Sequence, residues 1–197
     1  MIIGEYNTIF IHIPKNAGTS IEAHFLNRGF NFQPEKHATI HEIKKMFPGV
    51  YNSHNKFTII RNPYDRMISW YYYLKECKDI LEENDIPTLL SEPSLSSSVV
   101  QTKSIIDVKF KEWIKNPFSF YPKPPFNHYL DPQHTWIDET VTVLKFENLQ
   151  KEVNKFFDKN IELKVFNKTK HENYLNYYDK ETLDIVYNKY KEDFKKY

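Results

Sequence analysis

The chain has 197 residues, of which 40% are hydrophobic and 16% aromatic, enough to bury the core of one ordinary globular domain. Its 27 basic and 26 acidic residues leave a net charge of +1, which excludes a general attraction to nucleic acid or an anionic membrane, so any anion site must be local. The single cysteine, Cys77, excludes an internal disulfide and favours a reducing cytoplasm, and no run of about 18 apolar residues offers a membrane span.

The first predicted strand is Thr8 to Ile13, a β-branched and aromatic run that stops before a proline. Its His12 is expected to be a buried core residue. The loop Lys15-Asn16-Ala17-Gly18-Thr19-Ser20 follows and leads into a helix that should end near Gly29. Thr19 and Glu22 have the spacing of a capping box, so Thr19 is predicted to cap this helix.

A short strand and a second helix are predicted next. Gly29 to Gln33 (GFNFQ) is the candidate strand. Thr39 and Glu42 form a second capping-box pair, which opens a helix expected to end at Pro48-Gly49.

The second long strand, Phe57 to Ile60, is closed by Arg61. Asn62 suits the cap of a following helix and Pro63 its first position, because proline has no N–H to lose there. This helix is predicted to run to about Leu74.

The rest of the chain predicts one more strand and two helices within a single domain over residues 1–197. Residues 84–104, rich in Ser, Pro and Thr, are expected to form a mobile stretch and a candidate lid, and Pro117 to Pro132 should be irregular but packed. Val141 to Phe146 is a late strand followed by a helix from Glu147. The C-terminal helix, about Lys180 to Tyr197, places its apolar residues at helical spacing. They are Leu183, Tyr187, Tyr190 and Phe194.

Strands that alternate with helices imply an α/β fold, in which a central, mainly parallel sheet is flanked by helices in three layers. In such sheets ligands collect at the carboxyl ends of the strands, where helix N-termini favour anions. Two strand-to-helix junctions, at Lys15 and at Arg61, both have a cationic residue at this position. The first resembles a P-loop in that it offers backbone donors, hydroxyls and a lysine to an anion. Its lysine, however, precedes Gly18, whereas the lysine of a Walker motif follows the glycine.

Both junctions resemble those of the sulfotransferases that use 3'-phosphoadenosine-5'-phosphosulfate (PAPS). IFIHIPKNAGTSIE is similar to their 5'-phosphosulfate loop, and FTIIRNPYDRMISWYYYL to their 3'-phosphate segment. PQHTWIDE, VTVLKFENL and the C-terminal YYDKETLDIVYNKYKEDFKKY extend the likeness, while residues 82–124 are left unmatched. The resemblance is to the carbohydrate group, which contains the heparan, chondroitin and dermatan enzymes and bacterial relatives, and it implies a P-loop-NTPase-like fold.

The resemblance implies a role for each matching residue. Lys15 would contact the leaving phosphate and the sulfuryl group, as a catalytic residue. The remaining loop residues would hold the 5'-phosphosulfate: Asn16, Ala17, Gly18, Thr19 and Ser20. Arg61 and Ser69 would hold the 3'-phosphate, which distinguishes PAPS from ATP. No metal is expected, because a sulfuryl group carries less negative charge than a phosphoryl group.

The general base is assigned to His37, because related enzymes carry a histidine in a similar stretch. Other candidates for the base are His41, His54, Glu35 and Glu42. Gln133 and Trp136 are candidates for substrate contact or for packing, and Trp70 for stacking on adenine or for burial. Asn167, Lys168 and Lys170 form a basic cluster that is a candidate to close over the nucleotide.

The expected reaction is transfer of a sulfuryl group from PAPS to a hydroxyl of a small-molecule or glycan acceptor, with adenosine 3',5'-bisphosphate (PAP) as product. Nucleic acid and membranes are not expected as partners, and the sequence leaves the oligomeric state and the acceptor open. Two alternatives remain: a P-loop kinase or other nucleotide phosphotransferase, and an inactive protein that binds PAP or another nucleotide.

Overall fold

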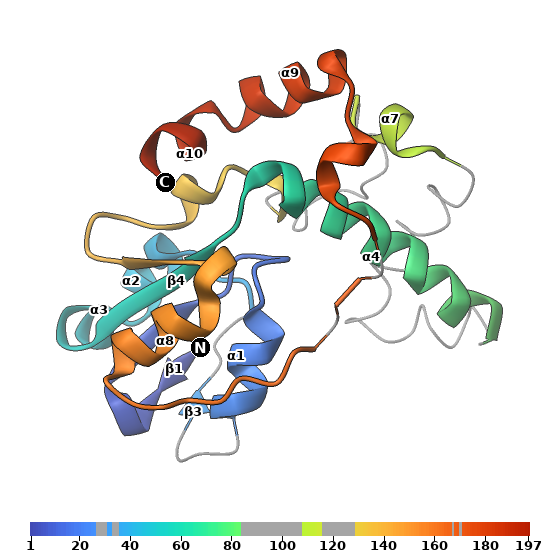
Figure 1. Ribbon diagram of the computed structural model, residues 1–197. Coiled ribbons are helices and arrows are strands. Elements are labelled where there is room, and N and C mark those ends of the chain that lie inside the picture. Colours follow the sequence, from blue (N-terminus) through green and yellow to red (C-terminus); the bar gives the residue numbers. More distant parts are fainter. Residues whose placement is uncertain (27–30, 33–35, 84–107, 116–128, 167, 170) are drawn as a thin grey trace. The chain divides into compact units, whose positions relative to one another are not determined.

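The computed structural model describes residues 1–26, 31–32, 36–83, 108–115, 129–166, 168–169 and 171–197 (Figure 1). Contacts divide the chain into two compact units. The first, which we call the sheet unit, comprises Met1–Asn62, Pro132–Lys168 and Glu192–Tyr197. The second, the helical unit, comprises Pro63–Asp131 and Thr169–Lys191. The expectation of a single domain over residues 1–197 stays a prediction.

The sheet unit is built on a five-stranded sheet of order β3-β1-β2-β4-β5. Its strands are β1 (Ile2–Ile3), β2 (Thr8–Ile11), β3 (Asn31–Phe32), β4 (Asn55–Ile60) and β5 (Thr142–Lys145). The three longest strands, β2, β4 and β5, run parallel, and the two-residue strands β1 and β3 add antiparallel pairs at one edge. The predicted α/β fold with a mainly parallel sheet is therefore confirmed.

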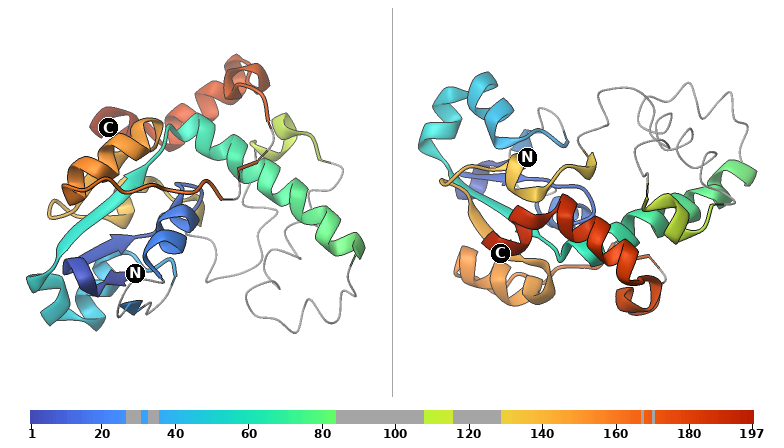
Figure 2. Two further views of the ribbon diagram at one scale, coloured as in Figure 1. Left: turned by 60° about the horizontal axis from the view of Figure 1, so that its bottom comes forward. Right: turned by 90° about the horizontal axis from the view of Figure 1, so that it is seen from above.

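Helices cover both faces of this sheet. On one face Phe10 and Phe57, which are paired in register, pack with Phe25 of α1 (Gly18–Phe25) and Phe157 of α8 (Leu149–Phe157). Because side chains alternate along a strand, Ile9 and Ile11 point to the other face, and they too are buried. Figure 2 (right) shows α2 (Ile40–Met46) and α3 (Pro48–Ser53) on the side of the strands opposite α8.

The capping prediction at Thr39 is confirmed and the one at Thr19 is wrong. Thr39 accepts a hydrogen bond from the Glu42 backbone and donates its own N–H to the Glu42 carboxylate (3.2 and 2.7 Å). Helix α1, in contrast, begins at Gly18 with Ala17 at the cap in the left-handed conformation. Glu22 does not reach back to Thr19, because its carboxylate makes a buried hydrogen bond with His12. Residues near Gly29, where this helix was expected to end, lie outside the described residues.

Proline explains where the next two helices begin. Helix α2 ends before Pro48, close to the predicted end, but Pro48 then opens α3, which the sequence did not predict. Proline suits the first position of a helix as well as the end of the preceding one. Pro63 opens α4 (Pro63–Glu83) as predicted, and this helix continues beyond the expected end at Leu74.

The helical unit consists of α4, α7 (Phe110–Trp113), η6 (Tyr174–Tyr177) and α9 (Lys180–Lys189). Aromatic side chains make much of their packing; for example, the rings of Tyr178 and Phe110 pack edge to face with their centroids 5.0 Å apart. The buried Arg66 of α4 donates to the carbonyls of Tyr129 and Asp131 and so holds the segment that follows the undescribed residues 116–128. No helix in the described part of the chain is long and apolar enough to cross a membrane.

The predicted C-terminal helix is two helices. Helix α9 ends at Lys189, Tyr190 leaves the helical conformation, and α10 (Lys191–Lys196) follows. The buried face of α9 also differs from the prediction, because Val186 is buried while Tyr187 is 44% exposed. The remaining short elements are the 3-10 helices η1 (Gly4–Tyr6), η4 (Gln133–Trp136) and η5 (Phe146–Asn148).

Several predictions concern residues outside the described ranges. These are the candidate lid at 84–104, most of the segment from Pro117 to Pro132, and both Asn167 and Lys170 of the basic cluster. Lys168, the third member of that cluster, is exposed.

Candidate functional site

The turn between β2 and α1 owes its shape to two left-handed residues and one close contact. Lys15 and Ala17 have φ angles of 69° and 59°, so the chain reverses tightly before the helix. A Cβ atom on Gly18 would lie 1.9 Å from Nε2 of His12, so no larger residue fits there without displacing the ring. The first hydrogen bonds of α1 run from Ser20 N and Ile21 N to Ala17 O (3.0 and 3.3 Å).

The N–H groups of Gly18 and Thr19 therefore come before the first helical hydrogen bond, at the positive end of the helix. Lys15, Ala17 and Thr19 are half-buried in this turn. Ser20 is buried, and its hydroxyl oxygen accepts a hydrogen bond from Phe166 N (3.2 Å). The turn can thus offer backbone donors, hydroxyls and a lysine to an anion.

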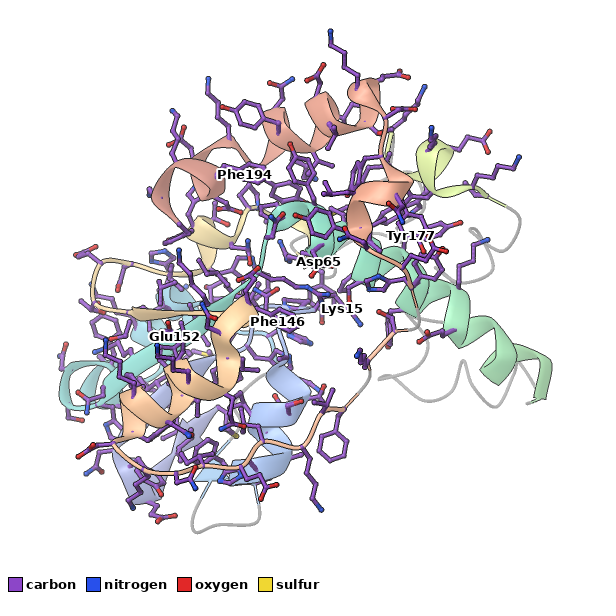
Figure 3. All side chains as sticks on the ribbon, in the orientation of Figure 1. Lys15, Asp65, Phe146, Glu152, Tyr177 and Phe194 are labelled. Atoms are coloured by element: carbon purple, nitrogen blue, oxygen red, sulfur yellow. The ribbon has the colours of Figure 1, made fainter. Side chains whose placement is uncertain are left out.

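Arg61 lies directly beside this turn. It follows β4, the parallel neighbour of β2, and its Nη1 donates to the backbone oxygen of Lys15 at 3.1 Å. The guanidinium carbon lies 4.2 Å from the ring centre of Phe146. Figure 3 labels Lys15 and Phe146, the two residues that Arg61 connects. This support fixes the direction of the arginine before any ligand arrives.

The backbone next to Arg61 is also tied down. Asn62 N donates to the carboxylate of Glu147, which follows β5, at 2.8 Å. Asn16 is 1% exposed, and its Nδ2 donates to the oxygens of Ile59 (2.7 Å) and of the Gln133 side chain (2.6 Å). Segments after β2, β4 and β5 therefore meet at the carboxyl end of the sheet.

His37 lies at this same end of β2. Its Nδ1 is 2.9 Å from the backbone oxygen of His12, and the two imidazole rings are 4.4 Å apart. Because a carbonyl only accepts, Nδ1 must carry the proton, and Nε2 of the neutral ring keeps a lone pair. Burial lowers the pKa of His37 to about 3.

His12 and Glu22 form a buried pair next to His37. Nδ1 of His12 and Oε1 of Glu22 are 2.6 Å apart, and Lys36 reaches the other carboxylate oxygen at 3.3 Å. Burial would raise the pKa of Glu22, but His12 and Lys36 outweigh it and hold that pKa below its usual range. Burial lowers the pKa of His12. The pair is therefore a neutral imidazole that donates to a carboxylate.

The other candidate bases lie elsewhere or are engaged. His54 precedes β4, whereas Arg61 follows it. The six residues of this strand span about 20 Å, so His54 lies at the opposite end of the strand from Arg61. His41 is exposed on α2, and the Glu42 carboxylate is held by Thr39. Glu35 lies outside the described residues. Among the described candidates, only His37 contacts the segment that leads into the Lys15 turn.

Ser69 and Trp70 lie in the helical unit, whereas loop residues 15–20 and Arg61 lie in the sheet unit. Both are buried on α4. Trp136 is buried in the sheet unit, next to Gln133, whose polar contacts the sequence did not reveal. The only sequence signal for Gln133 was its place in the segment PQHTWIDE, and Glu22 was assigned to the wrong partner.

Comparisons with known proteins support one family. Neither the comparison with curated proteins nor that with solved structures found a match. The model of the sulfotransferase family matches residues 1–197. With the α/β fold and the two adjoining turns in place, the chain belongs to the sulfotransferase family and is an enzyme that transfers a sulfuryl group.

Proposed function

We propose that this sulfotransferase takes its sulfuryl group from PAPS and transfers it to a hydroxyl of a carbohydrate acceptor. The observation that carries the proposal is the 3.1 Å hydrogen bond from Arg61 to the backbone of Lys15. It joins the two cationic turns that follow neighbouring parallel strands, so a nucleotide with a phosphate at each end of its ribose can meet both. ATP has no 3'-phosphate that could bind at the Arg61 turn.

Each turn suits one end of the donor. The 5'-phosphosulfate meets the N-terminal end of α1, where Gly18 and Thr19 present N–H groups and Lys15 adds a full charge. Arg61 takes the 3'-phosphate, because a guanidinium can donate two parallel hydrogen bonds to one phosphate. Ser69 of α4 is proposed to share that phosphate, as the resemblance implies.

The transfer is a single in-line displacement. The acceptor oxygen forms a bond to sulfur while the bond from sulfur to the 5'-phosphate oxygen breaks, and PAP leaves. The hydroxyl proton passes to Nε2 of His37, whose Nδ1–H is held by the His12 carbonyl. Lys15 stabilises the charge that develops on the leaving phosphate. The negative charge of the bound donor raises the basicity of His37 above that of the ligand-free protein.

The proposed acceptor and location follow from the resemblance and from the composition of the chain. A sugar hydroxyl is favoured by the resemblance to the carbohydrate group, with small molecules as the broader class. The single cysteine favours the cytoplasm. The chain's near-zero net charge gives no support to nucleic acid or a membrane as partner.

A transfer assay tests the reaction. Labelled PAPS is incubated with a panel of glycans and simple sugars, and the labelled product is counted. Replacing Lys15 by alanine should lower the rate at least about 100-fold, and replacing His37 by alanine about 100- to 10,000-fold. Full turnover by His37→Ala would remove it as the base.

Ligand stabilisation separates the alternatives. PAP should raise the melting temperature more than ATP with magnesium or AMP, because a ligand of the native state adds to its stability. A larger shift with ATP and magnesium would favour the kinase instead. PAP binding without transfer to any acceptor would favour an inactive nucleotide-binding protein.

A further inference from the structure

Gln133 uses all the polar groups of its side chain to join the two turns. Its Oε1 accepts from Asn16 Nδ2 (2.6 Å) and from Arg61 N (3.0 Å), and its Nε2 donates to Arg61 O (2.9 Å). The side chain thereby pairs with both backbone groups of Arg61, as a neighbouring strand would. At 1% exposure, these hydrogen bonds are shielded from competition by water.

The link reaches the Lys15 turn through Asn16. That residue lies between Lys15 and Ala17, and its amide also donates to Ile59 O, two residues before Arg61. Asn16 and Gln133 therefore close a ring of hydrogen bonds between the end of β4 and the turn before α1. A change in the distance between the turns would have to break at least one of these buried hydrogen bonds, which is unfavourable because the freed polar groups would stay buried.

Gln133 is itself held by Asp193 of α10. The Asp193 carboxylate, 2% exposed, accepts from Gln133 N (2.7 Å), from His134 N (2.9 Å) and from His134 Nδ1 (2.8 Å). It satisfies the first N–H groups of η4 and fixes the backbone from which the Gln133 side chain projects. Helix α10 thus holds Gln133 in place, and through Gln133 it supports the two turns.

We propose that Gln133 is a positioning residue that sets the separation of the Lys15 and Arg61 turns, and thereby the preference for a nucleotide with both a 5'- and a 3'-phosphate. The inference rests on the proposed function, in which each turn holds one phosphate. Gln133 does not touch the donor in this account. It acts by keeping two sites at the distance at which one ligand fills both, so that the ligand need not reorganise the protein on binding.

The expected signature is a selective loss. A ligand with both phosphates depends on the distance between the turns, whereas AMP and 3'-AMP each depend on one turn. Replacing Gln133 by methionine removes all three side-chain hydrogen bonds and keeps a side chain of similar length in the buried space. We expect the dissociation constant for PAP to rise at least tenfold, while those for AMP and 3'-AMP change less than about threefold.

Calorimetric titration of the three nucleotides tests this, with circular dichroism to verify folding. The matched control is Gln150→Met, since Gln150 also bonds backbone groups, those of Ile161 and Leu163, but on α8. The control should keep the wild-type ratios. If Gln133→Met fails to fold, Asp193→Asn replaces it, with a smaller loss of PAP affinity in the same direction.

The outcomes separate the two claims. Wild-type protein that binds PAP no more tightly than AMP or 3'-AMP would overturn the proposed function itself. The positioning role alone would be overturned if the wild-type protein prefers PAP but a folded Gln133 or Asp193 variant keeps this preference. It would also be overturned if such a variant loses affinity for all three nucleotides equally.

Discussion

At the scale of single residues, the site depends on the contact between Gly18 and His12. The imidazole ring lies where a side chain at residue 18 would be, and the same ring donates to Glu22 and lies beside His37. A glycine is required here because of this neighbour, and not because of a positive φ angle. The position of His12 therefore couples the shape of the anion-binding turn to the proposed base.

Replacing Gly18 by alanine should destabilise the protein by about 1–3 kcal/mol, because the new Cβ forces the His12 ring away from a buried partner. Urea unfolding measures the effect. Gly49→Ala is the matched control, since nothing lies within 4 Å of its Cβ position and it sits in α3. There alanine should be neutral or stabilising by up to about 1 kcal/mol. Equal effects at the two glycines would contradict the packing argument.

At the scale of elements, the break between α9 and α10 coincides with a buried tyrosine. The hydroxyl of Tyr190 donates to Leu130 O at 2.7 Å and lies 3.2 Å from the sulfur of Met67. The ring is 1% exposed. The chain leaves the helical conformation at the residue that makes this contact, so the tertiary hydrogen bond accompanies the end of α9.

Tyr190→Phe should cost about 1–2 kcal/mol of unfolding free energy, because the buried Leu130 carbonyl loses its donor. The exposed Tyr187 on the same helix provides the comparison, and Tyr187→Phe should change stability by less than about 0.5 kcal/mol. Denaturant unfolding of both variants decides it. A cost for Tyr187→Phe as large as that for Tyr190→Phe would show that the hydroxyl of Tyr190 is not what matters.

Local patterns predicted the long strands and the starts of two helices, but not the distant residues that their side chains contact. Apolar runs located β2, β4 and β5, and the Thr39 capping box and Pro63 located the starts of two helices. These signals act within a few residues. At the wrong cap and at the missed end of α9, in contrast, the side chains contact residues beyond the reach of such signals, namely His12 for Glu22 and Leu130 for Tyr190.

The same limit applies to the site. Lys15 and Arg61 were recognisable because each follows a strand and precedes a helix, and parallel strands bring such junctions together. Gln133 and Asp193 have no such pattern around them. Asn16, which donates to Gln133 Oε1, is 117 residues away in the sequence, and Asp193, which accepts from Gln133 N, is 60 residues away. Only the folded chain reveals these contacts.

At the scale of the whole molecule, buried titratable groups make stability depend on pH. His37 has a folded pKa of about 3 against an ordinary value of 6.5. Between these values the unfolded chain binds the proton that the native state excludes, so stability is full above pH about 6.5 and falls with acidification. His12 acts in the same direction, and Glu22 adds to the loss below pH 4.5.

From pH 7 to pH 5 we therefore expect the free energy of unfolding to fall by about 2 kcal/mol or more, at up to about 1.4 kcal/mol per pH unit for His37 alone. Urea titrations at several pH values measure it. His37→Gln should flatten this dependence, and His41→Gln, at an exposed position on α2, controls for the loss of a histidine. A slope unchanged by His37→Gln would mean that His37 takes up its proton as readily in the native state as in the unfolded chain.

The central claim is that the Lys15 turn and the Arg61 turn bind opposite ends of one nucleotide, and calorimetric titration of the two alanine variants tests it most directly. Arg61→Ala should weaken PAP about 10- to 100-fold and leave AMP within about twofold, because AMP has no 3'-phosphate. Lys15→Ala should weaken PAP and AMP but spare 3'-AMP. If Arg61→Ala weakens AMP as much as PAP, or if neither variant alters PAP binding, the two turns do not share this ligand.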